Sequence, residues 1–374
     1  MSVLLLILGL VLFVCLVIVH EWGHMIVARR NGVDVEEFGI GFPPAAKTKK
    51  LKSGMVLSLN WLPLGGFVKL KGEHDADTEK GSYGRANIWA KSRIMMAGVG
   101  MNLLTCFLIL TFLAAVGMPK LLDNQFTVSK DTKTSRNQVL IGYVEPGSPA
   151  EKAGLKVEDR LTSFVHDGQV FTAQSADTLP DITKRFPGKT VTVNYVRAGE
   201  AKSVTVTLRG TKEVEDSQKT DNPKGYLGIS PTEYTLRRST WSAPIVALGL
   251  MWQFTVATLA GLWHAISALF VGHTAEASAQ VSGPVGIFVI LKNGSLLGYQ
   301  FILMIIAVIS LTLAIMNALP IPALDGGRLF VTWVYKLLHK PLTQRAEEWI
   351  HGTGFAVLMV LFVLITIVDV KRFI

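Results

Sequence analysis

Two histidines and a glutamate stand close together near the start of the chain, in the motif HEWGH that runs from His20 to His24. On a helix, residues four positions apart share one face at about 5–6 Å, so both imidazoles can bind one Zn²⁺. Zinc lowers the pKa of a water that it binds to about 7, and the carboxylate of Glu21 can accept the proton of that water. These residue types at this spacing predict a hydrolytic zinc site.

The segment before this motif is apolar and carries no charged side chain over residues 3–19. Ionisable side chains inside a membrane span are energetically costly and generally have a function. The alternative is that the three polar residues only mark the interfacial end of a helix, but an interface does not require two histidines four positions apart. The location therefore favours the zinc site.

A third protein ligand is expected, because two histidines and a water leave one position of a tetrahedral zinc open. The segment NALPIPALDGGR, residues 317–328, offers Asp325. Two prolines before it and two glycines after it allow a sharp turn, and irregular backbone at membrane depth is tolerated where it lines a cavity. The alternative is a loop that ends a helix at the cytoplasmic face, with Asp325 near Arg328.

The elements that must position these residues are membrane spans. Of the 374 residues, 49% are hydrophobic and only 17% are charged, and the mean hydropathy is +0.39. Apolar runs of about 18 residues or more are typical of transmembrane helices. Four such runs predict four transmembrane helices, although the last run is short: residues 3–19, 94–118, 301–319 and 354–368. The fold class is thus a polytopic α-helical membrane protein.

Charge predicts the orientation of the chain. The loop of residues 29–93 holds twelve Lys and Arg against seven Asp and Glu, which favours the cytoplasm and leaves the N-terminus and residues 119–240 outside. The net charge of +9 is explained by this topology and by anionic lipid, and no nucleic-acid-binding motif is present. The lipid bilayer is an expected partner, and nucleic acid is not.

A fifth charge-free stretch, residues 241–271, is harder to place. His20 and Asp325 both stand at the C-terminal ends of their spans, so they can meet only if an odd number of crossings separates those two spans. We therefore predict that residues 241–271 do not cross. They would lie in or on the outer leaflet, where tryptophans suit the interface; the stretch contains Trp241, Trp252 and Trp263.

A small β-rich domain is predicted between the second and third spans. Val139, Ile141 and Tyr143 alternate as in a strand, a helical turn follows from Ser148, and residues 191–196 and 203–208 form a hairpin. Over residues 127–211 the pattern resembles a PDZ domain of bacterial proteases, which binds an extended peptide or an ectodomain segment at a sheet edge. The alternative is a β-rich spacer.

Together the motifs HEWGH and NALPIPALDGGR resemble the site-2 protease family of intramembrane zinc metalloproteases, and within it the RseP-like members that carry a PDZ insertion. The segments FGIGFPP, LPLGGFVKLKGE, GSPAEKAGL and SGPVGI also match that family, in the same order. The resemblance implies that His20, His24 and Asp325 hold the zinc and that Glu21 is the catalytic base.

The resemblance also implies positions that contact substrate. Asn317 corresponds to a family asparagine thought to contact substrate or the developing oxyanion; the alternative is a hydrogen bond between helices. Asn102, with Gly98, matches the family's G-x-x-x-N on the second span, where glycine also suits close helix packing.

The segment WLPLGGFVKLKGE alternates as a strand and resembles the membrane-associated β element of the family. Its residues Gly65, Gly66 and Phe67 would help to hold an unwound substrate along the strand edge. The alternative is a simple cytoplasmic hairpin.

The predicted organisation has four parts: an N-terminal membrane part (1–118), the PDZ domain (127–211), an interfacial helical region (225–298) and a C-terminal membrane part (299–374). The resemblance implies cleavage of transmembrane segments of single-pass proteins in regulated intramembrane proteolysis. The substrates would be of the anti-sigma-factor type, with remnant signal peptides as a second candidate class. The expected location is the bacterial inner membrane, with the active site near the cytoplasmic side and the PDZ domain outside.

Two rival functions come from other classes. A PDZ scaffold that has lost catalysis is disfavoured because both histidines, the glutamate and the aspartate are all present. A metal transporter would need ionisable residues along its whole path through the membrane, whereas in this sequence such residues are concentrated at one depth.

Overall fold

The structure is a computed structural model that describes residues 2–218, 223–271 and 282–373. The chain divides into two compact units. The membrane unit comprises Met1–Leu113 and Ala243–Ile374, and the β unit comprises Ala114–Ser242. Each unit is described by itself.

The membrane unit is built from long apolar helices. In the described part of the chain, five helices are long and apolar enough to cross a membrane: α1 (Ser2–Arg30), α2 (Ile88–Val116), α6 (Ala243–Val271), α9 (Tyr299–Ala318) and α11 (Gln344–Phe373). Two shorter helices, α8 (Pro284–Leu297) and α10 (Asp325–Leu337), lie before and after α9 in the chain. These helices would allow the chain to cross a bilayer several times.

The last helix is longer than its apolar run. The sequence predicts a short span over residues 354–368, whereas α11 has 30 residues. Hydropathy marks only the apolar middle of a helix, while the backbone hydrogen bonds continue through polar residues at both ends.

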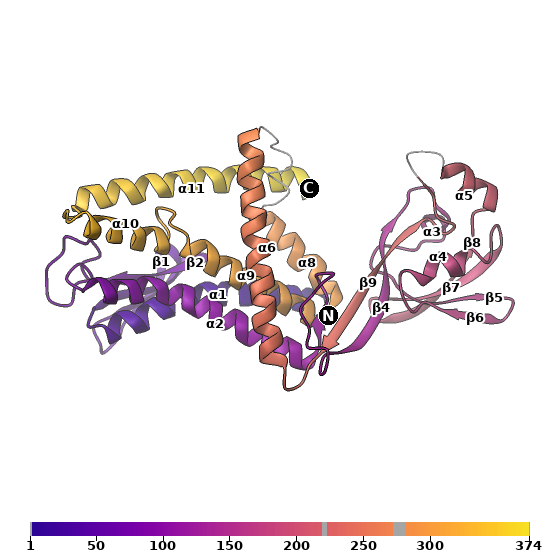
Figure 1. The fold of residues 1–374 in the computed structure, drawn as a ribbon, viewed down its shortest axis with the longest axis horizontal. Coiled ribbons are helices and arrows are strands. Elements are labelled where there is room, and N and C mark those ends of the chain that lie inside the picture. Colours follow the sequence, from indigo (N-terminus) through magenta and orange to yellow (C-terminus); the bar gives the residue numbers. More distant parts are fainter. Residues whose placement is uncertain (1, 219–222, 272–281, 374) are drawn as a thin grey trace. The chain divides into compact units, whose positions relative to one another are not determined.

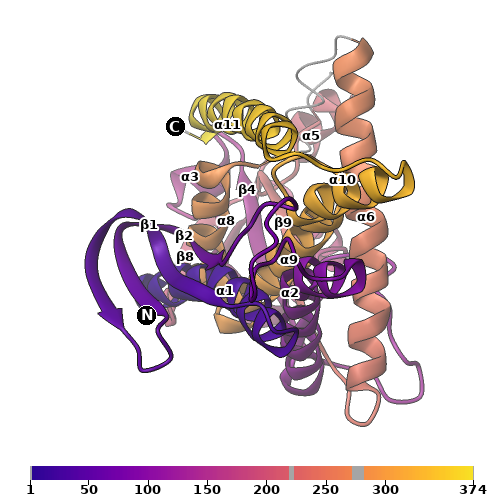
Figure 2. The ribbon, with the colours of Figure 1, turned by 90° about the vertical axis from the view of Figure 1, so that its left-hand side faces the viewer.

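Helix α6 meets the same criteria of length and composition as the other four, so these criteria do not decide whether it spans. In both views, however, α6 runs across the direction that α1, α2 and α11 share (Figures 1 and 2). The prediction that residues 241–271 do not cross the bilayer stays a prediction.

The cytoplasmic loop predicted between the first two spans forms a curled antiparallel hairpin of β1 (Val35–Lys50) and β2 (Val56–Leu70), seen at the left of Figure 2. The predicted strand around Phe67 is thus confirmed. Strand β2 contacts α1. Phe38 of β1 belongs to a buried cluster with Ala28 of α1 and Ile94 of α2. This packing brings the hairpin next to the helix that carries HEWGH.

The β unit is a seven-stranded antiparallel sheet with three short helices. Its strands follow the order β3-β9-β4-β5-β7-β8, and β6 pairs with β5. The strands are β3 (Met118–Pro119), β4 (Lys133–Val144), β5 (Arg160–His166), β6 (Gln169–Thr172), β7 (Thr190–Arg197), β8 (Glu200–Thr207) and β9 (Ile229–Arg238); the helices are α3 (Pro149–Lys152), α4 (Thr178–Thr183) and α5 (Thr211–Ser217).

Local expectations for this unit are confirmed. The alternating strand lies in β4, β7 and β8 form the hairpin, and Ser148 caps α3, since its Oγ accepts from the backbone N–H of Glu151. Strand β9 lies beyond residues 127–211 and pairs along the whole length of β4. The sheet is therefore larger than the predicted domain, because a strand distant in sequence completes it.

Candidate metal centre

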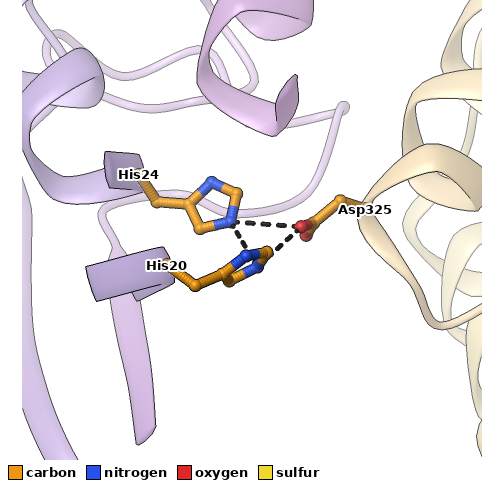
Figure 3. Close-up of side chains that lie close together, drawn as sticks. All are labelled: His20, His24 and Asp325. Carbon is orange, nitrogen blue, oxygen red and sulfur yellow. Dashed lines mark hydrogen bonds and ion pairs between the residues drawn. The ribbon is translucent and has the colours of Figure 1, made fainter. Parts of the chain in front are cut away.

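Two neighbouring histidines and an aspartate that is distant in the sequence meet in the membrane unit (Figure 3). Oδ2 of Asp325 lies 3.0 Å from Nε2 of His20 and 3.1 Å from Nε2 of His24. The two imidazole nitrogens lie 3.2 Å from each other. Each residue offers one ligand atom, and the three residues form the one metal-capable group found among the described residues.

The chain delivers Asp325 to this point by ending one helix and starting another. Helix α9 ends at Ala318, the backbone at Leu324 is extended, and Asp325 is the first residue of α10. The two glycines that follow are required by space, since a Cβ on Gly326 or Gly327 would overlap backbone atoms of residues 318–322. The turn therefore folds tightly back on the end of α9.

The donor set fits zinc. A tetrahedral zinc with bonds of about 2.0–2.1 Å separates its ligand atoms by about 3.3–3.4 Å, close to the 3.0–3.2 Å found between the three donors. The site also has room on the side of α2. Gly98 lies against the imidazoles, and a Cβ there would come within 2.6 Å of Nε2 of His20.

The protonation of His24 suits a ligand. Its Nδ1 lies 2.7 Å from the backbone oxygen of Ile94, which can only accept a hydrogen bond. Nδ1 of His24 therefore carries the proton in the neutral ring, and its Nε2 keeps a free lone pair. On the other ligand, Nδ1 of His20 lies 3.3 Å from the side-chain amide of Asn102.

Glu21 of α1 faces strand β2 of the hairpin. A Cβ added to Gly66 of β2 would lie 3.5 Å from Cγ of Glu21, and the backbone of Val68 hydrogen-bonds to the Glu21 carboxylate. Strand β2 therefore lies directly against Glu21. A side chain at position 66 would also meet the backbone oxygen of Gly39 at 3.0 Å.

Of the other predicted site residues, Gly65 and Phe67 lie on β2 and Asn317 lies on α9. Gly65 and Phe67 flank Gly66 on β2, where Gly65 has a φ of +101° and leaves space for the ring of Phe42. Asn317 is half-buried on the last turn of α9, in the segment that leads to Asp325. Among the described residues, Asn317 makes no hydrogen bond to any of the three ligands, whereas Asn102 lies 3.3 Å from His20.

Sequence reasoning did not single out two features of the site. Ile94 contributes a backbone carbonyl, which has no signature in a sequence. In the sequence, Gly98 stands out only through the family's G-x-x-x-N pattern and as a site of close helix packing, although its i, i+4 spacing to Asn102 places both residues on one face of α2. That spacing was the available signal.

Comparison with known proteins agrees with this geometry. The model of peptidase family M50 matches residues 8–361. The chain belongs to peptidase family M50. This M50 peptidase is 29% identical over 367 residues to a Clostridium perfringens protein named as a zinc metalloprotease, with 97% of each chain covered. It is also 26% identical over 434 residues to the Enterococcus faecalis protein named as the protease Eep, covering 97% of this chain and 98% of that one.

Membership in family M50 confirms the resemblance to site-2 proteases. The protein is a zinc metallopeptidase of the site-2 protease type, and Zn²⁺ is its cofactor. Since the described residues contain five helices able to cross a bilayer, it is a multi-pass membrane peptidase.

Proposed function

We propose that this M50 peptidase cuts peptide bonds within the membrane, with His20, His24 and Asp325 as the zinc ligands and Glu21 as the catalytic base. One observation carries the proposal. Three ligand atoms within hydrogen-bonding distance of one another come from both ends of the chain, and a glutamate directly follows the first of them in the same helix.

When bound, zinc would act as a Lewis acid that polarises the scissile carbonyl and lowers the pKa of the attacking water. Glu21 then accepts the proton of the attacking water and returns it to the leaving amine. The amide of Asn317, close in sequence to Asp325, is suited to donate to the oxygen that gains negative charge.

The hairpin would hold the substrate. A transmembrane helix hides its peptide bonds in its own hydrogen bonds, so the cleaved segment has to be extended. Residues 66–70 of β2 pair with β1 on one side only, so an extended segment can add to their other edge. Gly65, Gly66 and Phe67 lie on this strand, and Gly66 lies next to Glu21.

We infer a bacterial inner-membrane protein whose N-terminus and β unit lie outside and whose zinc site is near the cytoplasmic side. Helix α6 would lie in or on the outer leaflet. Its direction across the other long helices supports this placement (Figures 1 and 2), as do its exposed tryptophans. Trp252 and Trp263 are each 70% exposed.

The β unit is suited to bind an extended peptide as a PDZ domain does. A groove of about 230 Å³ lies between α4 and the start of β9, lined by Leu179, Lys184, Leu227 and Ile229 among others. Backbone at the start of a strand, an apolar floor and a lysine are suited to a peptide C-terminus with an apolar side chain. Such a domain would tether a substrate or exclude one with a large ectodomain.

The proposed substrates are single-pass membrane proteins of the anti-sigma-factor type that have already been shortened outside, with remnant signal peptides as a second class. Cleavage near the cytoplasmic side would release an intracellular fragment as the signal.

The test is cleavage of a tagged transmembrane peptide by the purified protein, with and without a zinc chelator, beside a Glu21→Gln variant. We expect wild-type cleavage that stops with the chelator and returns with zinc, and no cleavage by the variant despite equal zinc content. Cleavage by Glu21→Gln at the wild-type rate would exclude the proposed mechanism. Zinc transport into vesicles without cleavage would favour the transporter.

A further inference from the structure

Asn102 of α2 is enclosed between two other helices. Its side chain is 1% exposed, its Nδ2 lies 3.3 Å from Nδ1 of His20, and its backbone oxygen accepts a 2.8 Å hydrogen bond from the hydroxyl of Ser310 in α9. Its Oδ1 is buried and accepts no hydrogen bond from any described residue. A buried amide oxygen without a hydrogen-bond donor is energetically unfavourable.

The chemistry of a zinc ligand indicates which amide atom of Asn102 should face His20. A neutral histidine that gives the lone pair of Nε2 to a metal carries its proton on Nδ1. Nδ1 of His20 must then donate, so the atom of Asn102 that faces it has to be an acceptor. Rotating the amide by 180° exchanges Oδ1 and Nδ2 without moving any other group, and it gives the buried oxygen a donor.

The second histidine shows the same arrangement already formed. Nδ1 of His24 faces the backbone oxygen of Ile94 at 2.7 Å, an atom that can only accept. With the Asn102 amide rotated in this way, both His20 and His24 would have an oxygen behind the ring, from residues of α2 that are about two turns apart. One oxygen belongs to the backbone and the other to a side chain.

We propose that Asn102 is a positioning residue: its Oδ1 accepts the hydrogen bond of Nδ1–H of His20 and so keeps Nε2 unprotonated and directed at the metal. This inference rests on the zinc ligation proposed for His20. It differs from a substrate contact, since an amide that is 1% exposed and faces a ligand ring presents almost no surface to a substrate.

Zinc affinity of the full-length protein, measured by competition with a chromophoric chelator, tests the proposal without using activity. Asn102→Leu keeps a similar volume and removes the acceptor, and we expect its zinc dissociation constant to rise about 10–100-fold. Asn102→Asp keeps an acceptor oxygen, and we expect it to bind zinc at least as tightly as wild type. Thr105→Val is the control on the same helix, since its hydroxyl bonds only to the backbone oxygen of Met101 among the described residues.

Wild-type zinc affinity in a folded Asn102→Leu protein would overturn the inference and leave the proposed function intact. Should Asn102→Leu not fold, Asn102→Asp decides alone: retained zinc with the wild-type absorption spectrum of its cobalt-substituted form supports the role, and loss of zinc overturns it. A wild-type protein that binds no zinc would instead end the proposed function.

Discussion

Gly98 lies so close to His20 that a methyl group on the glycine would approach Nε2 of the histidine to 2.6 Å. Gly23 of α1 in turn lies against α2, where a Cβ would meet the backbone oxygen of Ala97 at 2.8 Å. The two glycines allow α1 and α2 to approach each other closely near the two histidines, and Gly98 leaves the space in front of the imidazole nitrogens open.

The first prediction concerns this space. Gly98→Ala puts a methyl group among the ligand nitrogens, so we expect zinc affinity to fall at least about 10-fold and peptidase activity with it. Gly100→Ala is a matched control on the same helix, because a Cβ there has no atom within 4 Å. Equal zinc content after dialysis of Gly98→Ala and Gly100→Ala would contradict the role given to Gly98.

A second prediction concerns a carboxylate buried outside the site. Oδ2 of Asp369, in α11, accepts hydrogen bonds from the backbone N–H groups of Gly283 at 2.8 Å and Gly286 at 2.7 Å, and thereby caps α8. Asp369→Ala leaves both donors without this partner in a buried place. We expect a loss of about 2 kcal/mol in the free energy of unfolding, measured by thermal or detergent denaturation.

Two companion variants sharpen that measurement. Asp369→Asn retains one acceptor oxygen and should lose less stability than Asp369→Ala. Thr366→Val, one turn away, removes an exposed hydroxyl that bonds within its own helix and should change little. If Asp369→Ala unfolds at the same point as Thr366→Val, the cap contributes nothing to stability.

The third prediction places α6. In a background without the two native cysteines, single cysteines at Trp241 and Phe270, which are 64% and 89% exposed, mark the two ends of the helix. A helix lying in the outer leaflet leaves both ends on the outer side, so an impermeant maleimide should label both in intact cells. Labelling of position 270 only after the membrane is permeabilised would mean that α6 spans the bilayer.

The fourth prediction concerns the groove of the β unit. A peptide with an apolar C-terminal residue should bind to the full-length protein, and amidation of its C-terminus should weaken binding because a charged hydrogen bond is lost. Lys184→Glu should weaken the free acid more than the amide, which fluorescence anisotropy can measure. Equal affinity of acid and amide would show that the groove does not recognise a carboxylate.

Much of the architecture follows from local sequence signals. The helix that carries His20 and His24, the strands β7 and β8 and the cap at Ser148 depend on hydrogen bonds between near neighbours in the chain, and residue spacing reports such bonds directly. Hydropathy also marks where apolar helices occur. It marks the ends of α11 poorly, because polar residues continue a helix as readily as apolar ones do.

The orientation of α6 could not be predicted from its own sequence. Its composition matches that of the spans, and its orientation depends on the neighbours against which it packs. Sequence reasoning reached a placement only through the requirement that His20 and Asp325 meet.

By itself the sequence determined the residue types of the centre, the helical spacing of its two histidines and the sharp turn at Asp325. Only the tertiary structure decided that Asp325 approaches His20 across 305 positions, that the oxygen of Ile94 stands behind His24 and that Gly98 leaves the nitrogens free. The physical reason is that spacing along a helix is set by bonds between neighbours, whereas these contacts depend on the packing of α1, α2 and α9, which no local pattern records.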